Sequence, residues 1–473
     1  MPQRIYVDGE WVPASGGAAI QVVNPATEEA FDEVPRSGPK DVARAVEAAA
    51  AALPAWSARP VTERAGLCAA VAAALGERAD ELTETIVNEL GMPIKLTRAI
   101  QVGSPIRTFL SMPEVAAAVA FEEPMGSSVV HRDPIGVVGA ITPWNYPLHQ
   151  IAAKVAPALT AGCTVVLKPS EVTPLDAFVL AEVMHEVGIP AGVFNVVSGT
   201  GPEAGEALAA HPLVDMVSFT GSTRAGRRVA ELAAAGVKRT ALELGGKSAN
   251  VLLDDLGDAA FEDAVRKGVA ACYLNSGQTC SALTRLLVPR ERLQDAERIA
   301  AAEAVTYTPG DPRDPATRLG PLVSAVQRER VREHLRSAAE DGATILTGGP
   351  DAPGGLERGY YVRPTVITGV APESRIAQEE IFGPVLVILP YDGEDEAVRI
   401  ANGTPYGLAA GVRAADQDRA LRVARRLRAG QVRINDGAHN GLAPFGGYKQ
   451  SGYGREYGRF GLEEFLTTTS VQL

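Results

Sequence analysis

Residues 216–226 read MVSFTGSTRAG. The first four residues have the composition of a buried strand, and the segment from Arg224 to Ala235 has that of a helix. Backbone N–H groups at the start of such a helix can bind a phosphate, and the glycines let the chain come close to it. The spacing differs from G-x-G-x-x-G, so the loop alone is explained more simply as an ordinary strand-to-helix turn.

The same alternation of strand and helix extends along the chain on both sides of this loop. Strands are expected at Thr164–Lys168, Val193–Val197, Met216–Phe219 and Thr240–Leu244, and helices at Asp176–Glu186, Gly205–His211 and Arg224–Ala235. Alternation of this kind predicts an α/β fold with a parallel sheet covered on both faces. Nucleotides bind at the carboxyl edge of such sheets, which gives the loop after Phe219 a second interpretation as a phosphate site.

Other segments set further expectations about local structure. Asp41–Ala52 is an alanine-rich helix that we expect to end before Pro54. Gly359–Val366 has the composition of a strand. The last third of the chain alternates helix and strand again, which predicts a second α/β unit, with elements at Glu394–Asn402, Gln417–Leu427 and Gln431–Asn435.

Size and charge exclude several classes of function. The 473 residues are enough for more than one domain, and 46% apolar and 22% charged residues are ordinary for a globular protein. The net charge of −12 argues against a nucleic-acid or anionic-membrane partner. The first residues lack the apolar core of a signal peptide, and no apolar run has membrane-spanning length. Four cysteines without a CxxC pair predict neither a metal site nor a disulfide framework, so we expect a cytoplasmic protein.

Residues 271–285, ACYLNSGQTCSALTR, contain a candidate nucleophile. Ser281 and Ala282 follow Cys280, and Gly277 lies three residues before it, so the backbone can bend and a substrate can reach the sulfur. The alternative is a buried free thiol, which is the commoner state of a cysteine.

A candidate base and a candidate amide donor lie elsewhere in the chain. Glu243 stands between two leucines, whose apolar surroundings would raise its pKa toward the range of a general base. The alternative for Glu243 is a carboxylate at an element terminus. Asn145 lies in TPWNYP (142–147), where two prolines fix the backbone, and a rigid amide suits an oxyanion. The alternative for this motif is a stiff aromatic turn.

Seven motifs occur in a recognisable order: PWNYP (143–147), KPSE (168–171), FTGS (219–222), ELGGKS (243–248), GQTC (277–280), EEIFGP (379–384) and PFGGYKQSG (444–452). Together they resemble the NAD(P)-dependent aldehyde dehydrogenase superfamily over nearly the whole chain. The resemblance implies an aldehyde dehydrogenase-like α/β fold. Its expected parts are a Rossmann-type cofactor-binding domain at 1–115 and 135–247, an α/β catalytic domain at 248–450, and a small β oligomerisation arm at 116–134 and 451–473.

The resemblance also implies a mechanism. Cys280 would attack the aldehyde, Asn145 and the Cys280 backbone N–H would hold the oxygen, and Glu243 would activate water to hydrolyse the thioester. Lys154 would steady Asn145. Two rival functions remain: a CoA-acylating dehydrogenase, which Glu243 disfavours, and a catalytically inert structural homologue, which the intact Cys280, Glu243 and Asn145 disfavour.

The cofactor implied by the resemblance is NAD. Its expected contacts are Thr142, Pro143, Trp144, Lys168, Ser170, Glu171, Gly201, Gly221, Ser222, Leu244, Gly245, Glu380 and Phe382. In this scheme Lys168 and Glu171 hold the adenosine ribose, Ser222 a phosphate and Glu380 the nicotinamide ribose, while Phe382 packs on the nicotinamide ring. A carboxylate at Glu171 would repel a 2′-phosphate, so NAD is favoured and NADP is a less favoured possibility.

The substrate pocket is expected to contain Tyr146, His149, Gln150, Leu274, Thr279, Ser281, His439 and Phe445. Small or polar residues predict a roomy pocket for a medium-sized aldehyde or a keto- or semialdehyde, and no arginine stands out as an anchor for a carboxylate. By resemblance, a hairpin near Glu122–His131 and the tail Phe465–Val471 would extend a neighbour's sheet, which predicts a homodimer or homotetramer.

Overall fold

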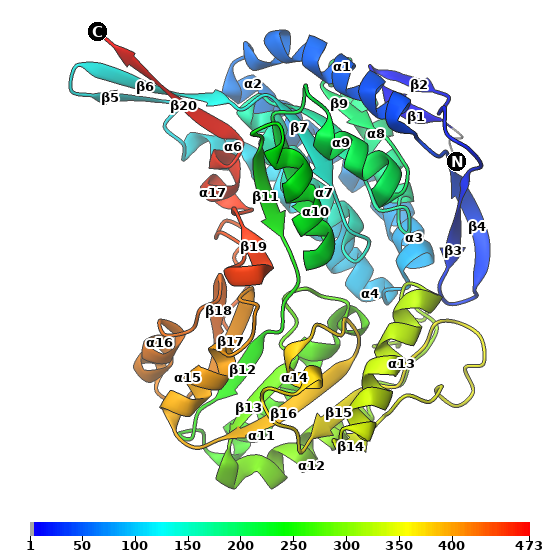
Figure 1. Ribbon diagram of the computed structural model, residues 1–473, viewed down its shortest axis with the longest axis vertical. Coiled ribbons are helices and arrows are strands. Elements are labelled where there is room, and N and C mark those ends of the chain that lie inside the picture. Colours follow the sequence, from blue (N-terminus) through cyan, green and yellow to red (C-terminus); the bar gives the residue numbers. More distant parts are fainter. Residues whose placement is uncertain (1–3) are drawn as a thin grey trace.

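A computed structural model describes residues 4–473 and shows two α/β lobes with a projecting β arm (Figure 1). Residues 1–3, which begin the predicted cofactor-binding range, lie outside the described residues. The described chain forms sheets of eight, seven, three and two strands. The mixed, mostly parallel sheets confirm the α/β fold class predicted from the alternation.

The eight-stranded sheet has the order β19-β11-β10-β7-β8-β9-β1-β2. Its parallel centre consists of β7 (Val137–Ile141), β8 (Thr164–Lys168), β9 (Phe194–Val196), β10 (Met216–Thr220) and β11 (Arg239–Glu243). Antiparallel strands close its edges: β1 (Ile5–Val7), β2 (Glu10–Val12) and β19 (Gly452–Tyr453). Strands β7 to β10 are buried at every residue, because helices cover both faces of the sheet.

The first lobe also has helices, some of which contact this sheet directly. They are α1 (Pro39–Ser57), α2 (Val61–Glu77), α3 (Ala79–Leu90), α4 (Ile94–Leu96), α5 (Gly103–Leu110), α6 (Met112–Ala117), α7 (Pro147–Ala161), α8 (Leu175–Val187), α9 (Glu206–Ala210), α10 (Thr223–Ala234) and α17 (Gly458–Glu463), with π turns at Thr97–Val102 and Gly201–Gly205. Helix α7 is buried at every position except His149. It begins at Pro147, two residues after Asn145, so the loop that holds this amide is anchored in the core.

The seven-stranded sheet of the second lobe has the order β14-β15-β16-β13-β12-β17-β18. Its strands are β12 (Ala249–Leu252), β13 (Arg285–Pro289), β14 (Thr344–Thr347), β15 (Thr365–Thr368), β16 (Val385–Tyr391), β17 (Ala409–Arg413) and β18 (Gln431–Ile434), and all neighbours except β14 and β15 are parallel. Its helices are α11 (Asp258–Tyr273), α12 (Leu293–Ala304), α13 (Ala325–Glu340), α14 (Arg375–Gln378), α15 (Glu394–Asn402) and α16 (Gln417–Ala424), with 3-10 turns at Leu274–Gly277, Arg290–Arg292 and Lys449–Ser451.

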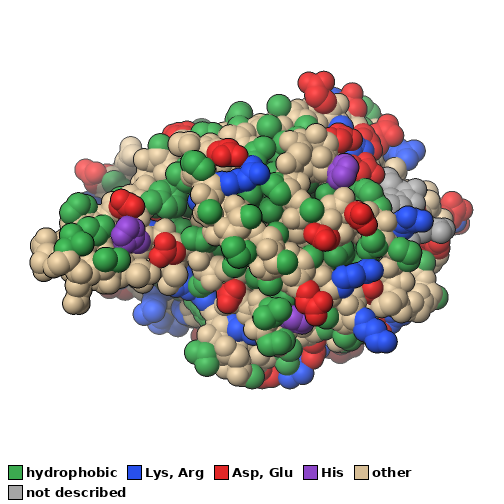
Figure 2. All heavy atoms as spheres, turned by 90° about the horizontal axis from the view of Figure 1, so that it is seen from above, with side chains coloured by type: hydrophobic (Ala, Val, Ile, Leu, Met, Phe, Trp, Pro, Cys, Tyr) green, Lys and Arg blue, Asp and Glu red, His purple; other side chains and the backbone are tan. Residues whose placement is uncertain are grey.

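The arm is a three-stranded antiparallel sheet of β5 (Glu122–Met125), β6 (Ser128–Pro134) and β20 (Leu466–Gln472), and it carries the C-terminus away from the lobes (Figure 1). A separate hairpin pairs β3 (Ile20–Asn24) with β4 (Glu29–Val34). Figure 2, which looks down on the arm and the first lobe, shows acidic, basic and apolar side chains interspersed on that face. Between residues 4 and 473, none of the helices is both long and apolar enough to cross a membrane.

Two local expectations were wrong. Helix α1 does not stop before Pro54 but continues to Ser57, because Ala58 N–H bonds to the Pro54 carbonyl and Trp56 is buried in the core at 1% exposure. The strand expected at Gly359–Val366 begins only at Thr365. Before that point the backbone N–H of Tyr360 donates to the Pro25 carbonyl, and its carbonyl accepts from the Leu322 N–H. These contacts with loops replace the hydrogen bonds to a neighbouring strand.

Candidate active site

The site forms where the edges of the two large sheets meet. The carboxyl ends of β7, β10 and β11 lead into Asn145, Gly221 and Glu243–Gly245. The amino ends of the second sheet face them, because Cys280 precedes β13 and Phe382 precedes β16. One cavity is lined by Asn145, Gly221, Leu244 and Gly245 together with Cys280 and Phe382, so the fold brings together motifs that are far apart in the sequence.

Cys280 is presented by a turn with unusual backbone angles. Asn275, Ser276 and Gly277 have φ of +51°, +55° and +75°, the left-handed region that side chains disfavour. A Cβ at Gly277 would lie 2.0 Å from the Gly383 carbonyl oxygen, so only glycine fits there. Cys280 is partly exposed, whereas Cys272 and the other two cysteines are buried. The accessible thiol is therefore Cys280.

Asn145 is held from both sides. Its backbone carbonyl accepts hydrogen bonds from Gln101 Nε2 at 3.1 Å and Asn275 Nδ2 at 2.9 Å. Its own Nδ2 donates to the Gln278 carbonyl at 2.9 Å, which leaves a second N–H on that nitrogen. Within residues 4–473 the backbone N–H of Cys280 has no acceptor. Two donors that flank the thiol are thus available to an oxyanion.

Glu243 is 4% exposed, and neither of its carboxylate oxygens has a hydrogen-bond partner in the described chain. Burial raises its pKa well above the usual range, and repulsion from Glu456 adds to the effect. A Cβ at Gly446 would lie 2.7 Å from Glu243 Oε1, so the glycine-rich loop closes over the carboxylate. A buried, unpartnered carboxylate with a raised pKa is suited to accept a proton near neutral pH.

Lys154, which the resemblance predicts to steady Asn145, has its hydrogen-bond partners elsewhere in the site. Its buried ammonium donates to Thr220 Oγ1 at 2.6 Å and to Glu456. Lys154 lies well along α7, where the end of β10 is its neighbour, whereas Asn145 precedes the helix. Glu456 was not anticipated, because GREYGRF (454–460) carries no pattern that singles out its carboxylate.

The thiol itself is held in its protonated form. Burial raises the pKa of Cys280 to about 12, and the carboxylates of Glu380, Glu243 and Glu456 raise it further. The thiol therefore needs a base or a nearby positive charge before it becomes a nucleophile.

One cavity beside Cys280, of about 580 Å³, contains most of the predicted cofactor contacts; we call it the cofactor cavity. It is lined by Pro143, Trp144, Asn145, Thr220, Gly221, Ser222, Leu244, Gly245, Cys280, Gln327, Arg330, Glu380 and Phe382. Trp144 and Phe382 meet edge to face with ring centroids 5.3 Å apart. Gln327 and Arg330, on α13, were not anticipated, because their helix has the charge pattern of a solvated face.

The remaining predicted cofactor residues lie outside this lining, near the ends of the neighbouring strands. Lys168 Nζ contacts the Glu171 carboxylate at 3.0 Å, and Ser170 Oγ accepts from the Val172 N–H. Gly201 opens a π turn, and Gly205 at the end of that turn approaches the Lys168 side chain. The Thr142 N–H donates to the Lys168 carbonyl. The Thr142 hydroxyl is buried and has no hydrogen-bond partner in the described chain.

A second cavity, of about 1000 Å³, lies on the other side of Cys280; we call it the aldehyde cavity. All eight residues predicted for the substrate pocket line it, together with Ile100, Ser104, Arg107, Cys280, Gln431, Arg433 and Tyr457. Sequence analysis found no candidate arginine, and here the structure corrects it: α5 brings Arg107 and β18 brings Arg433 to the lining. Both arginines lie far from Cys280 in sequence, so no local pattern indicated them.

His149 is fixed in the wall of the aldehyde cavity. Its Nε2 lies 2.8 Å from the Tyr457 hydroxyl, and the two rings stack with centroids 5.7 Å apart. Burial, helped by His439 and Arg107, lowers the pKa of His149 to about 4, so this ring is neutral at pH 7. The Gln150 Oε1 next to it is buried and has no partner within residues 4–473.

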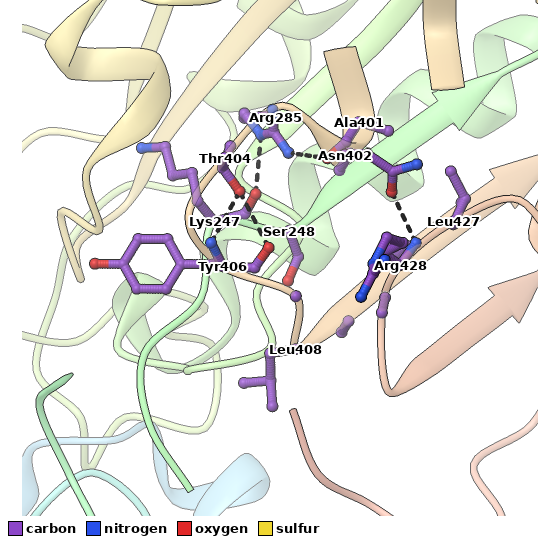
Figure 3. Close-up of a pocket in the computed structure, with 15 residues that line it drawn as sticks. Lys247, Ser248, Arg285, Ala401, Asn402, Thr404, Tyr406, Leu408, Leu427 and Arg428 are labelled. Carbon is purple, nitrogen blue, oxygen red and sulfur yellow. Dashed lines mark hydrogen bonds between the residues drawn. The ribbon is translucent and has the colours of Figure 1, made fainter. Parts of the chain in front are cut away.

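A smaller cavity of about 290 Å³ lies behind the site and does not include Cys280 in its lining (Figure 3). The Arg285 guanidinium donates hydrogen bonds to the backbone carbonyls of Lys247 at 2.9 Å, Ile400 at 2.9 Å and Ala401 at 2.8 Å. Burial lowers the pKa of Lys247 to about 7. These contacts join the ELGGKS segment to the end of α15, which is a structural role. Among residues 4–473, no group of three histidines, cysteines or acids is arranged to hold a metal.

The comparisons with known proteins identify the family. A family model described as "Aldehyde dehydrogenase family" matches residues 11–471. The chain belongs to the aldehyde dehydrogenase family. A similar curated relative is the 3-succinoylsemialdehyde-pyridine dehydrogenase of a Pseudomonas species, 47% identical over 99% of this chain and 98% of the relative.

Solved structures agree with this assignment. Aldehyde dehydrogenase C from Pseudomonas syringae, a cysteine-to-alanine mutant in complex with NAD⁺ and octanal, superimposes with a TM-score of 0.98 at 48% identity, over 100% of this chain and 96% of the other. An aldehyde dehydrogenase from Mycobacterium tuberculosis in complex with NAD⁺ gives 0.96 at 42% identity, over 100% and 98%. The predicted family and enzyme class, and the aldehyde dehydrogenase-like fold, are confirmed.

Proposed function

We propose that this member of the aldehyde dehydrogenase family oxidises aldehydes to carboxylic acids with NAD, through a covalent intermediate on Cys280. The observation that carries the proposal is that Cys280 lines both the cofactor cavity and the aldehyde cavity. From this position the Cys280 sulfur can bond to a substrate in the aldehyde cavity while the substrate carbon faces a cofactor in the cofactor cavity. The available amide donors and the buried Glu243 beside it supply the other groups that the reaction needs.

The cofactor cavity fits a dinucleotide. The N-terminus of α10, capped by Ser222, suits a phosphate, and the Glu380 carboxylate suits ribose hydroxyls. Lys168 and Glu171 would hold the second ribose, and Glu171 would repel a 2′-phosphate, so NAD is favoured over NADP. The NAD⁺ complexes of two similar proteins support this assignment. When bound, NAD accepts the hydride that leaves the substrate carbon.

The chain's own residues form the intermediate. The Cys280 proton passes to Glu243 as the sulfur bonds to the aldehyde carbon, and the carbonyl π electrons move to the oxygen. Asn145 Nδ2–H and the Cys280 N–H donate to that oxygen in the thiohemiacetal. With NAD bound as the hydride acceptor, collapse of the oxyanion would leave a thioester on Cys280.

Hydrolysis uses the same carboxylate. Once Glu243 has returned its proton to solvent, it accepts one from a water molecule whose oxygen bonds to the thioester carbon. The carbon–sulfur bond breaks, the acid leaves, and Cys280 recovers a proton. Glu456 and Lys154 lie next to Glu243 and set the electrostatic field in which it gains and loses that proton.

We propose a medium-sized aldehyde or a keto- or semialdehyde as the substrate. The aldehyde cavity combines apolar walls at Leu274 and Phe445 with the polar side chains of His149 and Gln150, which a purely aliphatic substrate would leave unused. A relative named for a semialdehyde that carries pyridine supports the keto- or semialdehyde, and a similar protein crystallised with octanal supports the medium-sized aldehyde.

The test is NADH formation from a panel of octanal, a keto-aldehyde and acetaldehyde, followed by absorbance. The wild-type protein should prefer the first two, Cys280→Ala should be inactive, and Cys272→Ala should keep its activity because Cys272 is buried. An acyl-CoA product on addition of CoA would support the acylating alternative. Inactivity of the wild type toward the whole panel would support the inert structural homologue.

The predicted domain division and assembly also remain proposals. The arm strands β5, β6 and β20 present an exposed edge that we propose pairs with another copy, as a homodimer or homotetramer, and free thiols suit a cytoplasmic location. Light scattering of the full chain and of a variant truncated before Leu466 tests the assembly. An unchanged mass in the truncated variant would contradict it.

A further inference from the structure

The outer end of the aldehyde cavity is marked by two exposed arginines. Arg107 comes from α5 in the first lobe, and Arg433 comes from β18 in the second. Both line the cavity whose inner end holds Cys280. The lining contains no aspartate or glutamate. The same cavity therefore contains a thiol that is only partly exposed and two arginines that are exposed to solvent.

Neither guanidinium is neutralised by a neighbour within residues 4–473. Arg107 Nη2 donates to Ser104 Oγ at 2.9 Å on its own helix, and Arg433 has no side-chain hydrogen bond or ion pair. Arg419 of the second lobe, by contrast, pairs with both Asp254 and Glu394. In a chain of net charge −12, two unpaired arginines that meet at one cavity have donors to spare for a ligand.

His439 shows that the two arginines face the same place. Burial lowers the pKa of His439, and the positive charges of Arg433 and Arg107 lower it further. Arg107 also lowers the pKa of the buried His149. Both rings are therefore neutral at pH 7 and offer hydrogen bonds rather than charge, so the two guanidinium groups provide the positive field.

The rest of the lining combines apolar and aromatic side chains, among them Ile100, Leu274 and Phe445, with uncharged polar ones. The apolar part suits a short carbon chain, and the two arginines are the charged groups of this lining. The arrangement thus matches a ligand with an aldehyde at one end, a carbon chain in the middle and an anion at the other end.

We propose that the preferred substrate is an aldehyde whose far end carries an oxyanion, either a carboxylate or a phosphate, and that Arg107 and Arg433 bind this group. The proposal rests on the proposed function and narrows its substrate class. The planar guanidinium donors match the geometry of both oxyanions, and partial exposure leaves room for ligands of somewhat different length.

The experiment compares kcat/KM for three aldehydes with NAD: hexanal, adipic semialdehyde, which has the same six carbons and a carboxylate, and glyceraldehyde phosphate. The proteins are the wild type, Arg107→Gln, Arg433→Gln, the double variant and Arg298→Gln. Arg298 is exposed on α12, pairs with Asp295 and serves as a matched control for the loss of one charge. Unchanged Tm values show that each variant is folded.

For the wild type we expect a higher kcat/KM with an anionic aldehyde than with hexanal. Each cavity variant should raise the KM for the anionic aldehyde by about tenfold or more, with little change for hexanal. Arg433→Lys should recover part of the loss, since it keeps the charge without the planar fork. Added salt should reduce the preference of the wild type for the anionic aldehyde over hexanal, and it should have a smaller effect in the double variant. Whichever anionic aldehyde is preferred identifies the oxyanion as carboxylate or phosphate.

Equal or better oxidation of hexanal by the wild type, with no selective loss in the variants, would overturn this inference and leave the proposed function standing. If no aldehyde yields NADH, the proposed function itself fails, and the inference fails with it.

Discussion

A Cβ atom at Gly246 would lie 2.5 Å from the backbone oxygen of Cys280. The link between β11 and β12 therefore passes the nucleophile turn with backbone against backbone. Since Glu243 lies at the end of β11, this contact also fixes the distance between the candidate base and the thiol. Glycine at 246 is needed for the geometry of the site, although it has no chemistry of its own.

The first prediction follows from this contact. Gly246→Ala should lower kcat by tenfold or more, because the methyl group must push the Cys280 backbone away from Asn145, and overpacking of this kind costs roughly 1–3 kcal/mol. Steady-state kinetics and Tm measure the effect. Gly66→Ala is the control: Gly66 lies in α2 with nothing within 4 Å of an added Cβ, so this variant should be as stable as the wild type and fully active. Equal activity of both variants would contradict the argument.

A second prediction concerns the ionisation of the thiol. Because burial raises the pKa of Cys280 to about 12, alkylation by iodoacetamide in the absence of cofactor should accelerate about tenfold per pH unit from about pH 7 to 10, without a plateau. Glu380 is the carboxylate that raises this pKa most, so Glu380→Gln should alkylate faster at every pH. Mass spectrometry of labelled peptides follows Cys280 alone.

The control for this experiment is Glu379→Gln, which removes the neighbouring exposed carboxylate that pairs with Arg375. It should leave the alkylation rate unchanged. A plateau near pH 8 in the wild type would show that the thiol is already activated without cofactor and would refute this picture of the site.

A third prediction concerns Glu456. Burial and repulsion from Glu456 raise the pKa of Glu243, and Glu243 must be deprotonated to activate water. Glu456→Gln removes the repulsion, so the pKa of Glu243 should fall and the rise of the hydrolysis rate with pH should move to lower pH. The pH profile of kcat measures this shift. A rise that moves to higher pH would mean that Glu456 matters mainly as the partner of Lys154.

The parts of the fold that the sequence predicts well are those decided by local pattern. The strand expected at Thr164–Lys168 and the helix expected at Glu394–Asn402 match β8 and α15 residue for residue. A buried parallel strand is apolar throughout, and a surface helix repeats its apolar residues at helical spacing. Motif residues at the ends of such strands can then be placed on the carboxyl edge of a sheet without knowledge of distant contacts.

Residues that reach the site from other elements could not be predicted in this way. Arg107 has the sequence context of an ordinary solvent-exposed helix residue, and only the fold brings α5 and β18 to the same cavity. The position of Glu456 beside Lys154 could not be predicted either, because it results from the contact of the last segment of the chain with α7. The strand expected at Gly359–Val366 fails for the same reason, since loops at Pro25 and Leu322 take its hydrogen bonds.

A fourth prediction concerns stability and pH. Glu89 on α3 and Asp176 on α8 are both fully buried, and burial raises the pKa of Asp176 to about 7 and that of Glu89 well above its usual range. Both carboxyl groups have a higher pKa in the folded protein than in the unfolded chain, so the folded protein binds their protons more tightly. The free energy of unfolding is therefore higher at acid pH, and it falls as the pH rises through about 7. We expect Tm to fall by a few degrees between about pH 5.5 and 8.

Glu89→Gln should reduce this fall, because the amide keeps the bond that Leu175 N–H donates to residue 89 and no longer competes for a proton. Glu84→Gln on the exposed face of the same helix should leave the fall unchanged. Identical pH slopes in the two variants would show that the buried pair does not control the stability.

The central claim is that Cys280 carries the acyl group and Glu243 releases it. The most direct test is intact-protein and peptide mass spectrometry of Glu243→Gln after incubation with NAD and an aldehyde that the wild type oxidises. The account predicts one equivalent of NADH and an acyl group on the peptide that contains Cys280. Unmodified protein after NADH has formed, or an acyl group on another residue, would contradict it.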